Sequence, residues 1–159
     1  MLIVSVETMV IVMENKISSK MLSFAKLSRD LYDITIEKSA IECGITKQEA
    51  DVLLFFANNP ELNRACDAVV YRGFSKAYVS KALNSLLKRG FVEIKDDTFD
   101  KRYQRIVVKK KVNKVLSSLR KTQDDYFSIL SEGISEEDFA IHIEVIEKIA
   151  ENIINRLKG

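Results

Sequence analysis

Residues 73–92 read GFSKAYVSKALNSLLKRGFV, and this stretch decides the fold. Ser75 is a favourable N-cap, and apolar residues then recur at helical spacing until Gly90 ends the pattern. The spacing predicts a helix from Lys76 to Arg89. Its other face is polar and carries lysines without one acidic residue, a pattern typical of a helix that contacts a polyanion. That face consists of Lys76, Ala77, Tyr78, Ser80, Lys81, Asn84 and Lys88.

Two helices and a hairpin are predicted around this helix. Residues 46–49, Thr-Lys-Gln-Glu, form a capping-box pattern that starts a helix, and Asn58-Asn59-Pro60 stops it. A short helix from about Glu61 to Tyr71 then closes at Gly73. After Gly90, residues 91–95 and 104–108 are rich in β-branched side chains, so they predict a β-hairpin with a polar tip.

Three longer helices are predicted outside this block, at residues 13–43, 111–131 and 135–157. In the last of these helices, apolar residues recur at alternating spacings of four and three residues. They form an apolar stripe along one side of the helix, which must be covered by another surface. The stripe consists of Phe139, Ile143, Ile146, Ala150, Ile153 and Leu157. We favour packing of the first and last helices both on each other and on a second copy of the chain, which predicts a homodimer. The alternative is a monomeric bundle in which the terminal helices cover each other.

Composition limits the class of protein. The chain has 159 residues, 47% of them hydrophobic, and five glycines and one proline, which predicts one or two compact, mostly helical units. Residues 72–111 carry twelve basic and four acidic residues, a net charge of +8, although the whole chain carries only +2. This asymmetry favours a polyanion-binding surface over a merely solvated face.

The first twelve residues form an apolar leader. Their apolar run has no basic residue ahead of it and no small-residue cleavage site after it, so these residues do not resemble a signal peptide. They are shorter than the roughly 20 residues of a membrane span. Residues 13–16, Met-Glu-Asn-Lys, resemble a protein start, so we interpret residues 1–12 as an optional or mis-assigned extension. With only two cysteines, the chain is expected in the cytoplasm and away from membranes.

The order of elements in residues 46–108 predicts a winged helix-turn-helix. The 76–89 helix is roughly 22 Å long, and it fits a major groove about 12 Å wide. Ser75 and the free amides at the helix start suit a phosphate, and Lys76 and Lys81 suit guanine or phosphate acceptors. Tyr78 could offer its ring to a thymine methyl and its hydroxyl to the DNA backbone. The expected DNA contacts are Ser75, Lys76, Ala77, Tyr78, Ser80 and Lys81, with Lys101 and Arg102 at the hairpin tip.

The stretch from Gly73 to Val92 resembles the recognition helix and first wing strand of the MarR family of bacterial transcriptional regulators. Asp100-Lys101-Arg102 resembles the wing signature of that family. The resemblance covers most of the chain, because such proteins also have a long first helix and two closing helices that dimerise. It implies that Asp100 and Arg102 stabilise the wing and that Arg102 enters the minor groove. It also implies a small-molecule effector pocket between the winged unit and the dimer helices.

Catalytic and metal chemistry find little support in the sequence. His142 is the only histidine, and no phosphate-binding glycine loop or Ser/His/Asp set is present. Cys43 and Cys66 are too few for a zinc site. Neither cysteine has a clear cationic neighbour in sequence, so we expect buried, unreactive thiols rather than redox sensors. The chain is therefore not expected to be an enzyme or to hold a cofactor or metal.

The sequence thus predicts a mainly α protein with a small β-hairpin wing. Residues 46–110 form the winged helix-turn-helix, and residues 13–45 and 111–159 form a helical dimerisation region. The favoured function is a dimeric repressor that binds double-stranded DNA sequence-specifically and responds to a ligand, with recognition helices about 34–36 Å apart. The alternative is a winged-helix module that binds an acidic protein, or nucleic acid without sequence preference.

Overall fold

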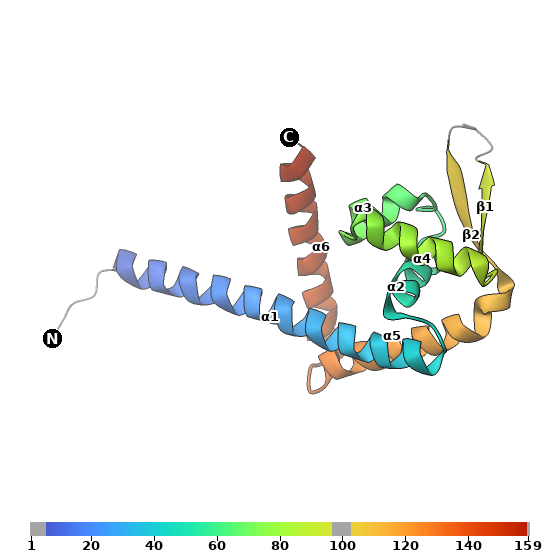
Figure 1. Ribbon diagram of the computed structural model, residues 1–159. Coiled ribbons are helices and arrows are strands. Elements are labelled where there is room, and N and C mark those ends of the chain that lie inside the picture. The colour runs from blue at the N-terminus through green and yellow to red at the C-terminus, as the bar shows by residue number, and fades with distance from the viewer. Residues whose placement is uncertain (1–5, 97–102, 159) are drawn as a thin grey trace. The chain divides into compact units, whose positions relative to one another are not determined.

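The structure is a computed structural model that describes residues 6–96 and 103–158 (Figure 1). The described residues form six α-helices, a short 3₁₀ helix and a two-stranded sheet. In chain order these are α1 (Val6–Glu42), α2 (Lys47–Asn58), α3 (Ala65–Arg72), α4 (Lys76–Lys88), β1 (Val92–Asp96), β2 (Gln104–Val108), η1 (Lys110–Val112), α5 (Asn113–Ser131) and α6 (Glu136–Lys158). The chain divides into two compact units, Met1–Gln123 and Asp124–Gly159.

Helix α2 lies at the centre of the first unit. Every residue from Glu49 to Phe56 is buried, because α2 is in contact with α1, α3, α4 and β2. The predicted capping box is present: the Glu49 amide donates to Thr46 Oγ1, and the Thr46 amide donates to Glu49 Oε2. Because α2 is apolar on nearly all sides, it can be stable only inside such a shell of neighbours.

The core around α2 is built from the inward faces of the other elements. Helix α4 contributes four buried side chains, α1 contributes Ile36 and Ala40, and each strand contributes one. The 3₁₀ turn η1 adds one more, and the start of α5 adds two. The contributing residues outside α1 and α2 are Ala68, Val79, Ala82, Leu83, Leu86, Val92, Ile106, Val112, Leu116 and Leu119.

The turn between α3 and α4 depends on a glycine. Gly73 has φ +67°, a left-handed conformation that glycine adopts without steric cost, and its amide donates to the Val69 carbonyl. Only Phe74 and Ser75 separate it from α4. The chain therefore reverses tightly, and α3 packs against α4 as in a helix-turn-helix.

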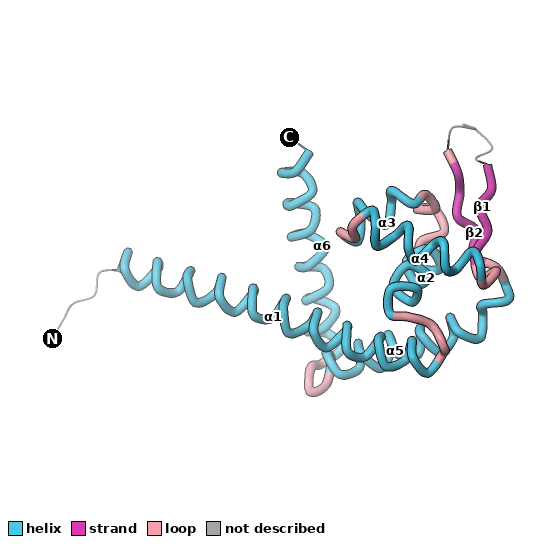
Figure 2. The backbone as a smooth tube through the Cα atoms, in the orientation of Figure 1, coloured by secondary structure: helices cyan, strands magenta, loops and turns pink. Residues whose placement is uncertain are grey.

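Strands β1 and β2 form an antiparallel hairpin beside α4 (Figure 2). Val92 pairs with Val108 and Ile94 with Ile106, so these side chains lie on one face of the hairpin. The Ile106 amide also donates to the Asn63 carbonyl at 2.7 Å, which joins the hairpin to the loop before α3. The expected fold class, mainly α with a β-hairpin wing, is confirmed.

Helix α3 begins later than the sequence predicted. We expected a start near Glu61, but the structure places it at Ala65. The residues after Pro60 form a turn in which the Leu62 amide donates to the Asn59 carbonyl. The Arg64 amide donates to the Asp67 carboxylate at 2.8 Å, and this cap sets the beginning of the helix.

Two other boundaries differ from the prediction. Helix α1 begins at Val6 and so continues into the apolar leader, although its end before Gly44 is as expected. Helix α5 begins at Asn113 after the 3₁₀ turn, rather than directly at Lys111. In the second unit, Ser135 caps α6 by accepting a hydrogen bond from the Asp138 amide.

Candidate nucleic-acid interface

The polar face of α4 is the centre of the candidate site. Val79, Ala82, Leu83 and Leu86 are buried in the core. The opposite face is open to solvent, since the amphipathic pattern of α4 forces its lysines outward. The exposed residues at the predicted DNA contacts are Ser75, Lys76, Ala77, Ser80 and Lys81, and Asn84 and Lys88 continue the same face.

The start of α4 is built to receive an anion. Ser75 Oγ accepts a hydrogen bond from the Tyr78 amide at 3.1 Å, so the helix is capped as predicted. The first turn contains no acidic side chain. The remaining free amides and the helix dipole therefore present partial positive charge next to Lys76.

Tyr78 differs from the other predicted contacts. Its side chain is half-buried, and its hydroxyl donates to Asp51 Oδ2 at 2.8 Å. Burial and the adjacent Asp51 carboxylate both raise the pKa of the Tyr78 hydroxyl, which keeps it a donor. This corrects the expectation that the hydroxyl is offered to the DNA backbone. The ring also packs against that of Phe74, with centroids 5.1 Å apart.

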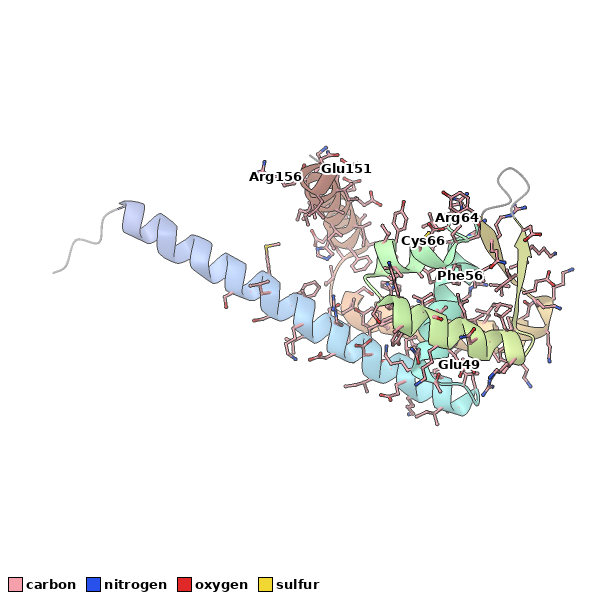
Figure 3. The ribbon with its side chains drawn as sticks, turned by 45° about the horizontal axis from the view of Figure 1, so that its top comes forward. Glu49, Phe56, Arg64, Cys66, Glu151 and Arg156 are labelled. Atoms are coloured by element: carbon pink, nitrogen blue, oxygen red, sulfur yellow. The ribbon has the colours of Figure 1, made fainter. Side chains whose placement is uncertain are left out.

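A buried carboxylate secures the other end of α4. Glu49 of α2, labelled in Figure 3, accepts a hydrogen bond from Ser85 Oγ at 2.7 Å and forms an ion pair with Arg89, whose Nε lies 3.1 Å from Glu49 Oε1. Burial by itself would raise the pKa of Glu49. The hydrogen bonds from Thr46 and Ser85 and the charge of Arg89 outweigh that effect, so the pKa is lowered. Glu49 thus remains ionised and holds α4 against α2.

This arrangement predicts a pH-dependent contribution to stability. A lowered pKa in the folded protein means that the Glu49 carboxylate stabilises the fold above its unfolded pKa near 4.5, and that this stabilisation is lost as the pH falls below it. We expect Glu49→Gln to lower the free energy of unfolding by about 1.5–3 kcal/mol at pH 7. The difference should shrink in urea titrations carried out from pH 7 down to pH 3.

Glu61→Gln is the matched control, because Glu61 is exposed and lies just beyond the same helix. It should change the free energy of unfolding little at any of these pH values. If Glu49→Gln lowers the free energy of unfolding by the same amount at every pH, the ionised carboxylate is not the stabilising form.

A contact between the hairpin and the residue before α3 was not predicted from the sequence. The Arg64 guanidinium lies over the Tyr103 ring, 4.1 Å from its centroid, in cation–π geometry. Figure 3 shows Arg64 and Cys66 together at the start of α3, on the side of the hairpin. The expected wing residues Asp100, Lys101 and Arg102 lie outside the described residues.

Other side chains singled out in the sequence are placed as follows. Cys66 is exposed, so the expectation of a buried thiol is wrong for it, whereas Cys43 is half-buried. Cys66 faces outward because the inward position on the short α3 belongs to Ala68. His142 is exposed on α6. Among the described residues, no three potential metal-ligating side chains lie together, and none of the helices is both long and apolar enough to cross a bilayer.

Asp51 and Gln48 are the residues that sequence reasoning missed. Asp51 is buried and binds Tyr78, and Gln48 Nε2 donates to the Tyr78 carbonyl at 2.8 Å. A signal was present in the sequence: residues 50–57 are otherwise apolar, so the charged Asp51 among them must find a buried partner.

Part of the chain matches a known protein family. A family model described as the MarR family matches residues 44–102, which run from the end of α1 through α4 into the wing. A search of the curated proteins finds no match.

Many solved structures share the fold. A MarR protein from Peptoclostridium difficile is 23% identical, with a TM-score of 0.69, and covers 86% of this chain and 88% of its own. A MarR transcriptional regulator from Methanosarcina mazei is 18% identical, with a TM-score of 0.69, and covers 88% of this chain and 98% of its own.

A third structure contains nucleic acid. It is described as a MarR family transcriptional regulator from Listeria monocytogenes complexed with 26mer DNA. It is 16% identical, has a TM-score of 0.74, and covers 84% of this chain and 89% of its own. At these identities the structures establish the fold, and the family model identifies the unit that carries α4. Residues 44–102 thus match the model of the MarR family, and the chain has the winged helix-turn-helix fold of the solved MarR structures.

Proposed function

We propose that this chain is a cytoplasmic homodimer that binds double-stranded DNA sequence-specifically and represses transcription until a ligand releases it. The observation that carries the proposal is the exposed face of α4, which bears Lys76, Lys81 and Lys88 and no acidic side chain. A helix of this length and charge fits the major groove. A Listeria protein of the same fold is described as complexed with 26mer DNA, which supports DNA binding by this chain.

Each residue of the interface has a proposed role. Ser75 and the amides at the start of α4 bind a phosphate and set the register of the helix. Lys76 and Lys81 reach base edges or adjacent phosphates, and Ala77 and Ser80 lie between them on the same face. The Tyr78 ring remains available for a thymine methyl. Asp100 and Arg102 stabilise the wing, Lys101 contacts DNA, and Arg102 enters the minor groove.

Dimerisation is proposed through residues 13–45 and 111–159, with residues 46–110 binding DNA. The support is a set of large apolar side chains that are exposed in the single chain and that a second copy would cover. On α6 these include Ile143, Ile146, Ile149, Ile153, Ile154 and Leu157. On α1 they include Met21, Leu22, Phe24, Leu27 and Ile34.

A cleft supports the ligand-dependent part of the proposal. It has a volume of about 560 Å³ and lies between the end of α2, the hairpin and the start of α5. Apolar side chains such as Phe56 and Leu116 line it together with the cations Lys95, Arg105 and Arg120. This volume lies within the range of small-molecule sites. A ligand that favours one spacing of the recognition helices would shift the population away from the DNA-bound state.

A selection experiment tests the proposed function. Duplexes recovered from a random-sequence library by the unaltered protein should bind about a thousandfold or more tightly than random duplex. If the dimer contacts about eight phosphates, log affinity should fall with log salt with a slope of about −7. Electrophoretic mobility shifts over a salt series would measure both quantities.

Two results would contradict the proposal. Equal binding to selected and random duplex would favour the alternative function, a winged-helix module that coats nucleic acid without sequence preference. A salt-insensitive interaction, or binding only to acidic proteins, would show that the cationic face of α4 does not meet DNA.

A further inference from the structure

A buried carboxylate lies at the centre of the first unit. The Asp51 side chain is only 3% exposed. Its Oδ2 atom receives Lys47 Nζ at 2.6 Å and the Tyr78 hydroxyl at 2.8 Å, whereas its Oδ1 atom has no hydrogen-bond partner. A buried ion pair of this kind adds little net stability compared with apolar residues of the same size. The helices that this ion pair connects are therefore more informative about its role than its contribution to stability.

The contacts around Asp51 link three helices. Lys47 Nζ also lies 2.9 Å from Asp33 Oδ1, and Asp33 belongs to α1. Charge-assisted contacts thus run without a break from α1 to Lys47 and Asp51 on α2 and on to Tyr78 on α4. Burial tends to lower the pKa of Lys47, but the two carboxylates outweigh that effect and raise it, so Lys47 stays charged between them.

The contacts end at the part of α4 that is proposed to read DNA. Tyr78 lies in the first turn, between Lys76 and Ser80, and α2 holds it at two points. Its hydroxyl binds Asp51, and its carbonyl accepts a hydrogen bond from Gln48 Nε2 at 2.8 Å. A small displacement of Tyr78 would therefore move Lys76 and Ser80 together.

We propose that Asp33, Lys47, Asp51 and Tyr78 form an α1–α2–α4 relay that sets the position of the recognition helix according to the position of α1. Tyr78 is a positioning residue in this relay, and Asp51 is its centre. A rearrangement of α1 that separates Asp33 from Lys47 changes how Lys47 and Asp51 share their contacts, and so loosens Tyr78. The part of this proposal that concerns DNA rests on the function proposed above.

Variants at the two ends of the relay provide the test. Asp33→Asn removes the charge that faces Lys47, and Tyr78→Phe removes only the hydroxyl. Asp30→Asn is the matched control, because Asp30 lies on the same helix and pairs with Lys26 of that helix. Affinity for the duplex selected by the unaltered protein is measured for each single variant and for the Asp33/Tyr78 and Asp30/Tyr78 double variants.

The relay predicts coupling between Asp33 and Tyr78. Independent sites combine their effects to within about twofold, whereas members of one network deviate further. We expect the affinity loss of the Asp33/Tyr78 double variant to fall short of the product of the single losses by about threefold or more. The losses of the Asp30/Tyr78 pair should multiply. If the affinity losses of the Asp33 and Tyr78 variants also multiply in their double variant, the relay is overturned.

A second measurement separates this proposal from the proposed function. If the unaltered protein selects no duplex, the proposed function fails, and amide hydrogen exchange in the free protein decides on the relay. Exchange in residues 76–80 should be faster in Asp33→Asn than in Asp30→Asn. Equal exchange in the two variants would overturn the relay whatever the protein binds.

Discussion

The double variant Lys76→Ala/Lys81→Ala is expected to bind the selected duplex about a hundredfold or more weakly at 0.15 M salt. Both lysines are exposed on the face of α4 opposite the core, so their removal leaves the packing of the helix intact. The proposed dimer presents each lysine twice, and the variant therefore removes four cations from the interface. The slope of log affinity against log salt should become less steep by about 3.6.

A control double variant removes the same number of positive charges from helices other than α4. Lys38→Ala/Lys148→Ala takes two exposed lysines from α1 and α6. Its affinity and salt slope should stay close to those of the unaltered protein, and both variants should remain dimers in sedimentation experiments. An equal loss in the two double variants would mean that only the overall charge matters, and the assignment of α4 would be wrong.

Ile146→Asp is expected to abolish the dimer. Ile146 lies in the middle of the α6 stripe and is 43% exposed in the single chain. In a two-fold interface the substitution places two carboxylates within an apolar surface, where an unpaired charge costs several kcal/mol. Sedimentation equilibrium should show a monomer at micromolar concentration, with helical content retained because the site is not in the core of the chain. Affinity for the selected duplex should fall with the loss of the second recognition helix.

Asn155→Asp provides the matched control for this variant. It adds the same charge to α6 on the side of the helix that faces away from the stripe, since residues 146 and 155 differ by two and a half helical turns. It should remain a dimer. A monomeric unaltered protein, or a dimeric Ile146→Asp variant, would show that the α6 stripe does not mediate self-association.

Local signals in the sequence predicted most of the fold. The capping box at Thr46, the N-cap at Ser75 and the glycines at 44, 73 and 90 each fix a helix end through contacts within a few residues. Amphipathic spacing likewise separated the buried and exposed faces of α4. The start of α3 was missed, because the turn after Pro60 and the Asp67 cap compete with a helical pattern that the residues otherwise permit.

Contacts between residues distant in sequence could not be predicted in the same way. Asp51 and Tyr78 are 27 residues apart, and Arg64 and Tyr103 are brought together only by the hairpin. Periodicity places Tyr78 on the polar face of α4, but that face is wide enough for its edge to meet α2. The hydroxyl is therefore bound within the protein, although its neighbours Lys76 and Lys81 are exposed as expected.

A dimethyl sulfate footprint of the selected duplex tests the central claim most directly, namely that the exposed face of α4 reads the major groove. The reagent methylates guanine N7, which lies in the major groove. The predicted result is protection of guanine N7 in two patches about one helical turn apart, lost in the Lys76→Ala/Lys81→Ala variant. Full binding without any protection of guanine N7 would contradict the account.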